Sequence, residues 1–209
     1  MTRAALIERL LRQIYGGYVT DDSQITTNLV NNWLNDAIGL AAKQNYKESF
    51  QLEGVGYVNN SFYSRFSSIS ISYDSTNTYK LTLPEIPLGI GANEGISTLQ
   101  LIDSKGNISR PLVPLSESQR SFYEGLRPVQ NRTLYYYQGS TAYILSHIIL
   151  TQYTARVTMV SGGDSTSLTS EVNVPPDYYP VMVEYIKQQL GFEKAQVQDL
   201  NNDGADFSK

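Results

Sequence analysis

The alternation of hydrophobic and polar positions divides the chain into two helical ends and a strand-rich middle. At the N-terminal end apolar residues recur at helical spacing in two successive segments, which a glycine pair at 16–17 separates. Thr2 is placed to cap the first helix, and the second opens within residues 21–23. Two helices joined by a short glycine-containing turn predict a helical hairpin over residues 1–46. The apolar positions are Leu6, Ile7, Leu10, Leu11 and Ile14 in the first helix, and Ile25, Leu29, Val30, Trp33, Leu34, Ala37, Ile38 and Ala41 in the second.

After Tyr46 the pattern changes to a period of two. Residues 68–73 and 79–83 alternate polar and apolar side chains around a turn at 74–77, which predicts a β-hairpin with one buried face. A Ser-x-x-Gln capping box predicts a short helix near 116–126. Because the strands follow one another without intervening helices, the fold class is predicted as α+β, with a central antiparallel β-sandwich or barrel-like body. The body spans residues 47–174, and its further strands are expected at 96–102, from 108, at 133–137, at 142–150 and at 154–160.

The C-terminal part, residues 175–209, begins with the clearest helix signal of the chain. Asp177 can cap this helix, and Pro180 is tolerated in its first turn. Apolar residues fall on one face, so we expect the helix to lie on the β body, with the whole chain forming one compact domain. Beyond it the sequence is acidic and too polar to pack by itself, which predicts an extended tail. The apolar face consists of Tyr179, Val183, Ile186 and Leu190.

Composition narrows the classes of function. The chain has 16 tyrosines, one tryptophan, no cysteine and a net charge of −4. The tyrosines fit either a surface that contacts other proteins or a strand-rich core, and composition alone does not choose. The absence of clustered Lys and Arg argues against a general nucleic-acid binder. Charged residues interrupt the N-terminal apolar residues, and residues 142–150 are too short to span a membrane, so a non-secreted, soluble protein is expected.

Catalytic chemistry finds little support. His147 is the only histidine, and it falls inside the predicted strand 143–150 with no Gly-x-Ser-x-Gly motif elsewhere, so a structural or interface role is favoured. The glycine-rich segment 89–95 lacks the lysine of a phosphate-binding loop and precedes a predicted strand, so it is interpreted as a loop between strands. We therefore predict a protein that is not an enzyme and has no catalytic residue and no cofactor.

The acidic tail contains one metal-like pattern. Asp199, Asn201, Asp203 and Gly204 match the first, third and fifth ligands and the turn glycine of an EF-hand calcium loop. The bidentate glutamate would lie one residue beyond Lys209, and no exiting helix follows. A solvated or partner-bound tail is therefore favoured over a calcium site, and no metal site is predicted.

The layout resembles a known class of proteins. A helical pair, a body rich in Tyr and Ser, and the segment VPPDYYPVMVEYIKQQLGFEKAQVQDLNNDG at 174–204 together resemble head-to-tail adaptor and neck ring proteins of tailed bacteriophages. The likeness is to the ring proteins of crAss-like phages and, more distantly, to the tail tubular adaptors of short-tailed phages. By layout it covers most of the chain, and by motif it depends mainly on residues 175–203.

The resemblance implies a structural virion protein at the head–tail junction, assembled in the host cytoplasm. It implies a homo-oligomeric ring of about 12 copies that binds the portal protein and adjacent tail or ring proteins, and helps to retain and conduct DNA without sequence-specific binding. The alternatives are another tail structural subunit (a terminator, a further ring or a baseplate part) and, from a different class, a carbohydrate-binding β-module or a glycosidase. The residues expected to contact partners are Tyr178, Asp199, Leu200, Asn201, Asp203 and Asp206.

Overall fold

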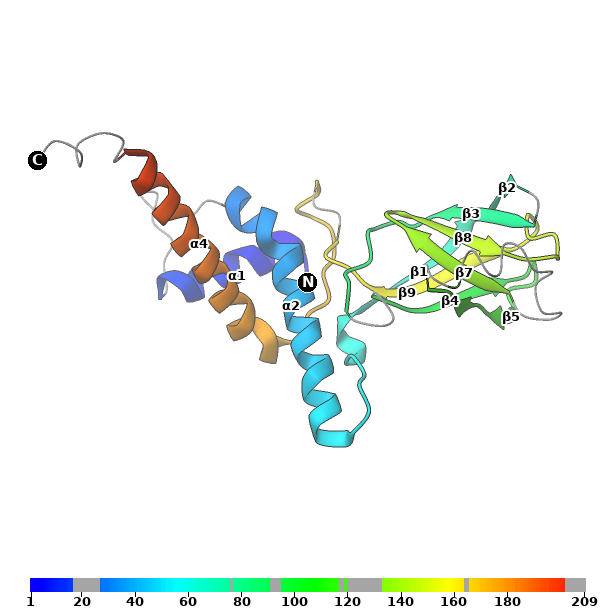
Figure 1. Ribbon diagram of the computed structural model, residues 1–209, viewed down its shortest axis with the longest axis horizontal. Coiled ribbons are helices and arrows are strands. Elements are labelled where there is room, and N and C mark those ends of the chain that lie inside the picture. Colours follow the sequence, from blue (N-terminus) through cyan, green and yellow to red (C-terminus); the bar gives the residue numbers. More distant parts are fainter. Residues whose placement is uncertain are drawn as a thin grey trace, which may run out of the picture.

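The computed structural model has an α+β fold with two lobes, one helical and one of β-strands (Figure 1). It describes residues 1–16, 27–75, 77–90, 95–116, 119, 133–163 and 166–201; at residues 109, 110 and 192–201 the description covers the backbone alone. Each lobe has its own hydrophobic core. The sequence therefore predicted the fold class and the helical ends correctly.

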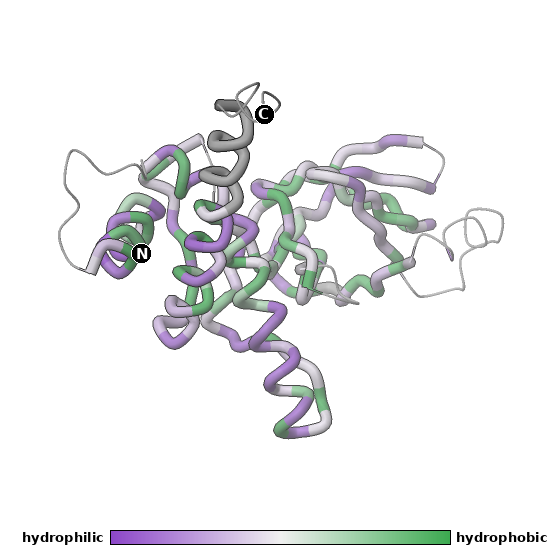
Figure 2. Tube along the Cα trace, turned by 60° about the vertical axis from the view of Figure 1, so that its left-hand side comes forward, coloured by the Kyte–Doolittle hydropathy of each residue, from purple (hydrophilic) through white to green (hydrophobic). Residues whose placement is uncertain are grey.

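The helical lobe contains α1 (Arg3–Tyr15), α2 (Thr27–Glu53) and α4 (Tyr179–Asn201), the last preceded by the 3₁₀ turn η2 (Pro176–Tyr178). The start of α1 is fixed as predicted, because the Thr2 side chain accepts a hydrogen bond of 3.3 Å from the Ala5 N–H. The helix ends at Gly16 in the left-handed conformation. Hydrophobic and hydrophilic residues alternate along the helices, as amphipathic faces require (Figure 2).

Helix α4 packs on the other helices, and the prediction that it lies on the β body is wrong. Its predicted apolar face is buried, with Tyr179 and Ile186 almost fully excluded from solvent. The same core includes Leu6 of α1 and Leu34 of α2, while the β lobe is built around a different cluster. The two ends of the sequence therefore form one helical unit, and the strands are inserted between them (Figure 1).

Two expected boundaries of the helices are also corrected. Helix α2 continues past Tyr46 to Glu53, because no helix breaker occurs before Gly54, whose N–H closes the helix on the Phe50 carbonyl at 2.9 Å. Likewise α4 continues to Asn201, so the first residues assigned to the extended tail are helical. In both cases the apolar periodicity stops before the helix does.

The β lobe is a sandwich of two separate sheets rather than a closed barrel. The 4-stranded sheet has the order β1-β9-β4-β5 and is antiparallel. The 5-stranded sheet has the order β2-β3-β8-β7-β6, and its last pair, β6 and β7, is parallel, which corrects the expected all-antiparallel body. Residues from both sheets share one core. The strands are β1 (Tyr63–Ser70), β2 (Ser72–Ser75), β3 (Thr78–Thr82), β4 (Ile96–Ile102), β5 (Ile108–Pro111), β6 (Val113–Pro114), β7 (Leu134–Gln138), β8 (Thr141–Leu145) and β9 (Thr154–Val160), and the turn η1 (Asn60–Phe62) precedes β1.

The strand predictions hold in most places. The hairpins β4–β5 and β7–β8 form as expected, and β9 buries Ala155, Val157 and Met159 on its inner face. The predicted strand 68–73 is instead divided between the two sheets, since the chain crosses over at Ile71 after Ser68 adopts a positive φ of 62°. Only the part after the crossover pairs with β3.

The predicted strand 142–150 and the predicted short helix have different outcomes. Strand β8 ends at Leu145, and the last contact in its register with the β2–β3 turn is the bond from the Ser146 N–H to the Asn77 carbonyl at 2.9 Å. His147 therefore lies outside the strand and is exposed, contrary to prediction. One bond of the predicted capping box is present, with the Gln119 side chain accepting from the Ser116 N–H at 3.3 Å, and the Gln119 N–H donates to the Ser116 carbonyl at 3.0 Å. The rest of the expected helix, residues 117, 118 and 120–126, lies outside the described residues.

A seam of backbone and side-chain contacts joins the two lobes. The Pro87 backbone bridges to Ser161, and the Leu88 N–H donates to the Val160 carbonyl at 2.9 Å. At the start of α1, the buried Arg3 guanidinium donates to the Asn35 side chain at 2.8 Å and to the Gly162 carbonyl. The seam therefore holds the end of β9 against the helical lobe.

Candidate functional site

Tyr178, predicted as an exposed contact residue, is instead part of the internal packing. Its ring is half-buried and lies 5.4 Å from the Phe62 ring, centroid to centroid. Its hydroxyl donates to Glu48 Oε2 at 2.6 Å and accepts from Asn45 Nδ2 at 2.7 Å. Tyr178 therefore joins the turn before α4 to the C-terminal half of α2. The prediction that it is exposed is wrong, because it is half-buried, and its role as a partner contact stays a prediction.

This contact sets the direction of two pKa shifts. Hydrogen bonds from Tyr178 and Gln44 lower the pKa of Glu48, while burial and the hydrogen bond to Glu48 raise the pKa of Tyr178. The contact is therefore complete only while Glu48 is ionised and Tyr178 is protonated. Its contribution to stability is present between about pH 4.3 and pH 10, the unfolded pKa values of the two groups. It is lost as the pH falls through the lowered pKa of Glu48 or rises through the raised pKa of Tyr178.

We expect Tyr178→Phe to lower the free energy of unfolding at pH 7 by about 1–2 kcal/mol, because two hydrogen bonds of the hydroxyl are lost and the ring is kept. The loss should shrink as the pH is lowered below about 4, since protonation of Glu48 weakens the same contact in the parent protein. Urea unfolding at pH 7 and at pH 3 measures both. Tyr73→Phe on an exposed strand is the matched control, and an equal loss at the two pH values would contradict the assignment.

The other predicted contact residues lie at the C-terminal end. The backbone at Asp199, Leu200 and Asn201 forms the last turn of α4. Asp203 and Asp206 lie outside the described residues. An EF-hand loop would need the first two of its ligands in a loop, so their helical backbone contradicts the calcium pattern. Over the described ranges, no group of three or more His, Asp or Glu side chains is placed to hold a metal ion.

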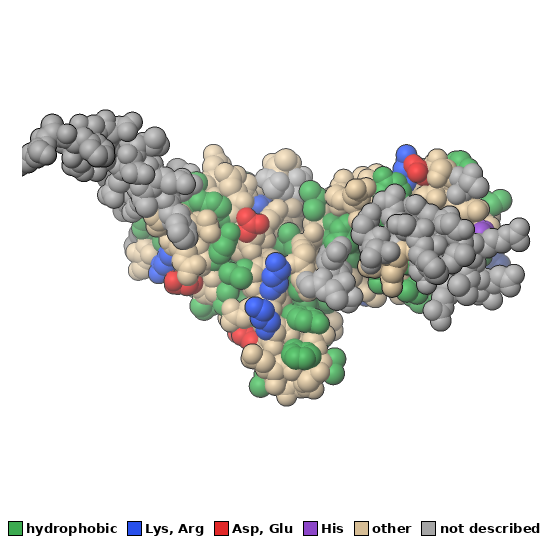
Figure 3. Space-filling view, in the orientation of Figure 1, with side chains coloured by type: hydrophobic (Ala, Val, Ile, Leu, Met, Phe, Trp, Pro, Cys, Tyr) green, Lys and Arg blue, Asp and Glu red, His purple; other side chains and the backbone are tan. Residues whose placement is uncertain are grey.

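An exposed apolar patch at the end of α2 was missed by the sequence analysis. Phe50, Leu52, Val55 and Tyr57 are all exposed, and Leu52 retains 85% of its surface. They form the tip that projects downward in Figure 1, where hydrophobic side chains gather on the surface (Figure 3). We call these four residues the α2 tip. The sequence did contain a signal for this patch, because apolar residues occur after the point where the helix was predicted to end. The helix continues there to Glu53.

A second exposed apolar patch lies in the β lobe. Ile148 and Ile149 follow the end of β8 and are 50% and 66% exposed. They lie beside the β2–β3 turn, because the Ser146 N–H is bonded to the Asn77 carbonyl. This turn is at the far end of the β lobe, well separated from the α2 tip (Figure 1). These two adjacent side chains form a small apolar surface that another protein could contact.

No family model and no curated protein matches this chain. In the part of the chain that the structure describes, no helix is both long and apolar enough to cross a membrane.

Proposed function

We propose that the chain is a structural subunit of a phage particle that assembles as a ring at the head–tail junction. The observation that carries the proposal is the pair of exposed apolar patches, the α2 tip and Ile148–Ile149. The first projects to one side near the middle of an elongated subunit, and the second lies at the far end of the β lobe (Figure 1). A ring requires heterologous contacts, in which two different surfaces of the subunit meet. Two separated patches provide surfaces for a neighbouring subunit and for the component above or below the ring.

The resemblance of the layout to neck ring proteins supports the same proposal. In such a ring the portal lies on one side and the next tail component on the other, and DNA passes through the centre. The net charge of −4 suits this passage, because DNA then meets few strong phosphate contacts. A different ring or tail position in the same particle would share these properties and differ in copy number and neighbours.

The mass of the protein in solution tests the proposal. We expect light scattering to give a complex of about a dozen copies, either for the protein alone or after mixing with a candidate portal ring. Leu52→Asp should abolish this complex or reduce it at least about tenfold, because a charge is placed in an apolar contact. Gln51→Asp, which adds the same charge at the neighbouring exposed position, is the matched control. A monomer under both conditions would refute the ring.

A further inference from the structure

The outer face of the 4-stranded sheet carries a polar groove that neither the motifs nor the proposed function explains. It has a volume of about 770 Å³. Side chains from β1, β4 and β9 line it, on the face opposite to the sandwich core. They include Tyr63, Arg65, Thr98, Gln100, Arg156 and Thr158.

The strand register brings two arginines together in this groove. Arg65 pairs with Thr158, and Arg156 lies two residues before Thr158 on β9, where it pairs with Gln100 of β4. Arg65 and Arg156 are therefore diagonal neighbours on one face, with Cα atoms about 7–8 Å apart. Two guanidinium groups at this spacing can bind the same anionic segment.

The groove lacks a carboxylate to neutralise these charges. No Asp or Glu is among its lining residues. The ion pairs found within the described residues are Arg12–Glu8 and Lys80–Asp74, and neither involves this groove. The Nε atom of Arg156 is buried and has no hydrogen-bond acceptor among the described residues. Guanidinium, hydroxyl and amide donors thus converge on a site suited to carboxylates or phosphates.

A second, smaller pocket adjoins the groove. Its volume is about 270 Å³, and Tyr63 and Ser97 line both spaces. The remaining walls include Tyr46, Val58 and Ile90. Burial raises the pKa of Tyr63, so its hydroxyl remains a donor at neutral pH. The combined site therefore fits an acidic peptide segment that carries an apolar side chain close to its carboxylates.

The chain itself contains a segment of this chemistry. Residues 199–209, DLNNDGADFSK, carry three aspartates against one lysine, and Phe207 follows Asp206 directly. Double-stranded DNA is a poorer match, because it has one phosphate per about 1.7 Å of its axis and needs a longer row of cations than this groove supplies.

The segment cannot fold back to the groove of its own copy. Helix α4 begins against α2, to which Tyr178 of the preceding turn is bonded, and runs away from the β lobe (Figure 1). Its 23 residues span about 34 Å at a rise of 1.5 Å each. Residues 202–209, even fully extended, reach at most about 28 Å. The groove lies beyond the seam on the other lobe, so a second copy must supply the segment.

We propose that the groove binds the acidic segment 199–209 of a neighbouring copy, with Asp203 and Asp206 accepting from Arg65 and Arg156 and with Phe207 in the adjoining pocket. This contact depends on the proposed ring assembly, and it assigns the segment to the next subunit instead of the portal. It would add a polar, salt-sensitive link to the apolar contacts between copies.

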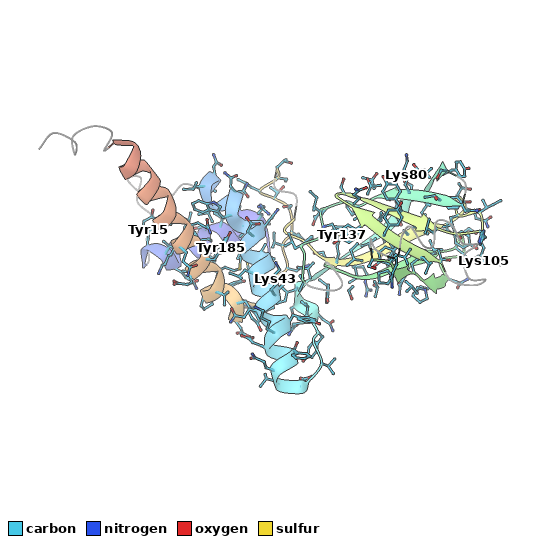
Figure 4. The ribbon with its side chains drawn as sticks, in the orientation of Figure 1. Tyr15, Lys43, Lys80, Lys105, Tyr137 and Tyr185 are labelled. Atoms are coloured by element: carbon cyan, nitrogen blue, oxygen red, sulfur yellow. The ribbon has the colours of Figure 1, made fainter. Side chains whose placement is uncertain are left out.

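The probe is a fluorescent synthetic peptide of residues 196–209, titrated by anisotropy into dilute full-length protein. We expect saturable binding that weakens with salt and falls at least about tenfold in the double variant Arg65→Gln/Arg156→Gln, since both charge-assisted pairs are lost. The matched control is Lys43→Gln/Lys80→Gln, which removes the same charge from α2 and from β3 of the other sheet (Figure 4). It should leave the affinity unchanged, whereas a peptide with Phe207→Ala should bind more weakly, because the apolar side chain assigned to the adjoining pocket is lost.

Charge reversal makes the test specific. The protein with Arg65→Glu and Arg156→Glu should reject the natural peptide and bind a peptide with Asp203→Lys and Asp206→Lys. Absence of peptide binding, equal binding by the double variant, or tighter binding of a single-stranded DNA oligonucleotide that displaces the peptide would overturn the proposal. If the peptide fails while light scattering still shows a ring, the groove assignment alone is wrong. If the peptide binds and no ring forms with or without the portal, the groove assignment stands and the ring function is wrong.

Discussion

Replacing Arg3 by methionine is expected to lower the free energy of unfolding by about 3 kcal/mol, which is at the upper end of the usual range for a single substitution. Arg3 has no exposed surface, and its guanidinium donates to the Asn31 carbonyl at 2.8 Å and the Asn35 side chain at 2.8 Å. It also donates to the Gly162 carbonyl. Methionine has a similar length and no donor, so these oxygens would be left without their partner in a dry environment.

Urea unfolding followed by Trp33 fluorescence measures this loss, because the single tryptophan lies on α2 between Asn31 and Asn35. Arg3→Lys should be only slightly more stable than Arg3→Met. Lysine keeps the positive charge but lacks the planar guanidinium group, whose several N–H donors reach separate acceptors. Arg12→Met is the matched control on the same helix: its ion pair with Glu8 is exposed, so its loss should change the free energy by less than about 1 kcal/mol. Similar losses for Arg3→Met and Arg12→Met would refute the role of Arg3 in the seam.

Arg3 illustrates what the sequence could not predict. An arginine in the first turn of an amphipathic helix normally lies on the solvent-exposed face. Nothing in the local sequence shows that its partners are Asn31, Asn35 and Gly162, the last of which is 159 positions away. The periodicity of α1 and of the apolar face of α4 was read correctly, because each pattern is contained within one element. Which lobe α4 joins depended on contacts between the two ends of the chain, and the pattern of one helix does not contain this information.

The same distinction applies to the interaction surfaces. The α2 tip was missed because residues beyond the apolar stripe were assigned to the β body, whereas the helix continues on its own propensity to Gly54. Tyr178 was assigned to the surface from its residue type, yet its partners Asn45 and Glu48 lie more than 100 residues away. Predicting the groove would have required the register between β1 and β9, which makes Arg65 a diagonal neighbour of Arg156. Such pairings follow from the topology of the sheet and not from local alternation.

Gly95→Ala is expected to be the second large effect, at about 2–4 kcal/mol of lost stability. Gly95 has a φ of +86°, where a side chain is strained. A Cβ at this position would overlap the Leu88 carbonyl oxygen and would lie 2.8 Å and 2.9 Å from the Leu88 carbonyl carbon and nitrogen. These are backbone atoms, so the overlap cannot be relieved by a rotamer change. The Leu88 backbone would have to move, although its N–H is bonded to Val160 in the seam.

Gly106→Ala separates the two causes. Gly106 has a φ of +84°, almost the same as Gly95, but a Cβ there meets nothing within 4 Å. Its substitution should therefore show only the strain of the left-handed backbone, about 1 kcal/mol. We expect the loss of unfolding free energy for Gly95→Ala to exceed that for Gly106→Ala by at least about 1–2 kcal/mol in urea unfolding. Of the two glycines, only Gly95 lies against the backbone of Leu88. Equal losses would mean that the close approach of Leu88 contributes nothing. The excess loss at Gly95 would measure the cost of moving the Leu88 backbone away from its bond to Val160.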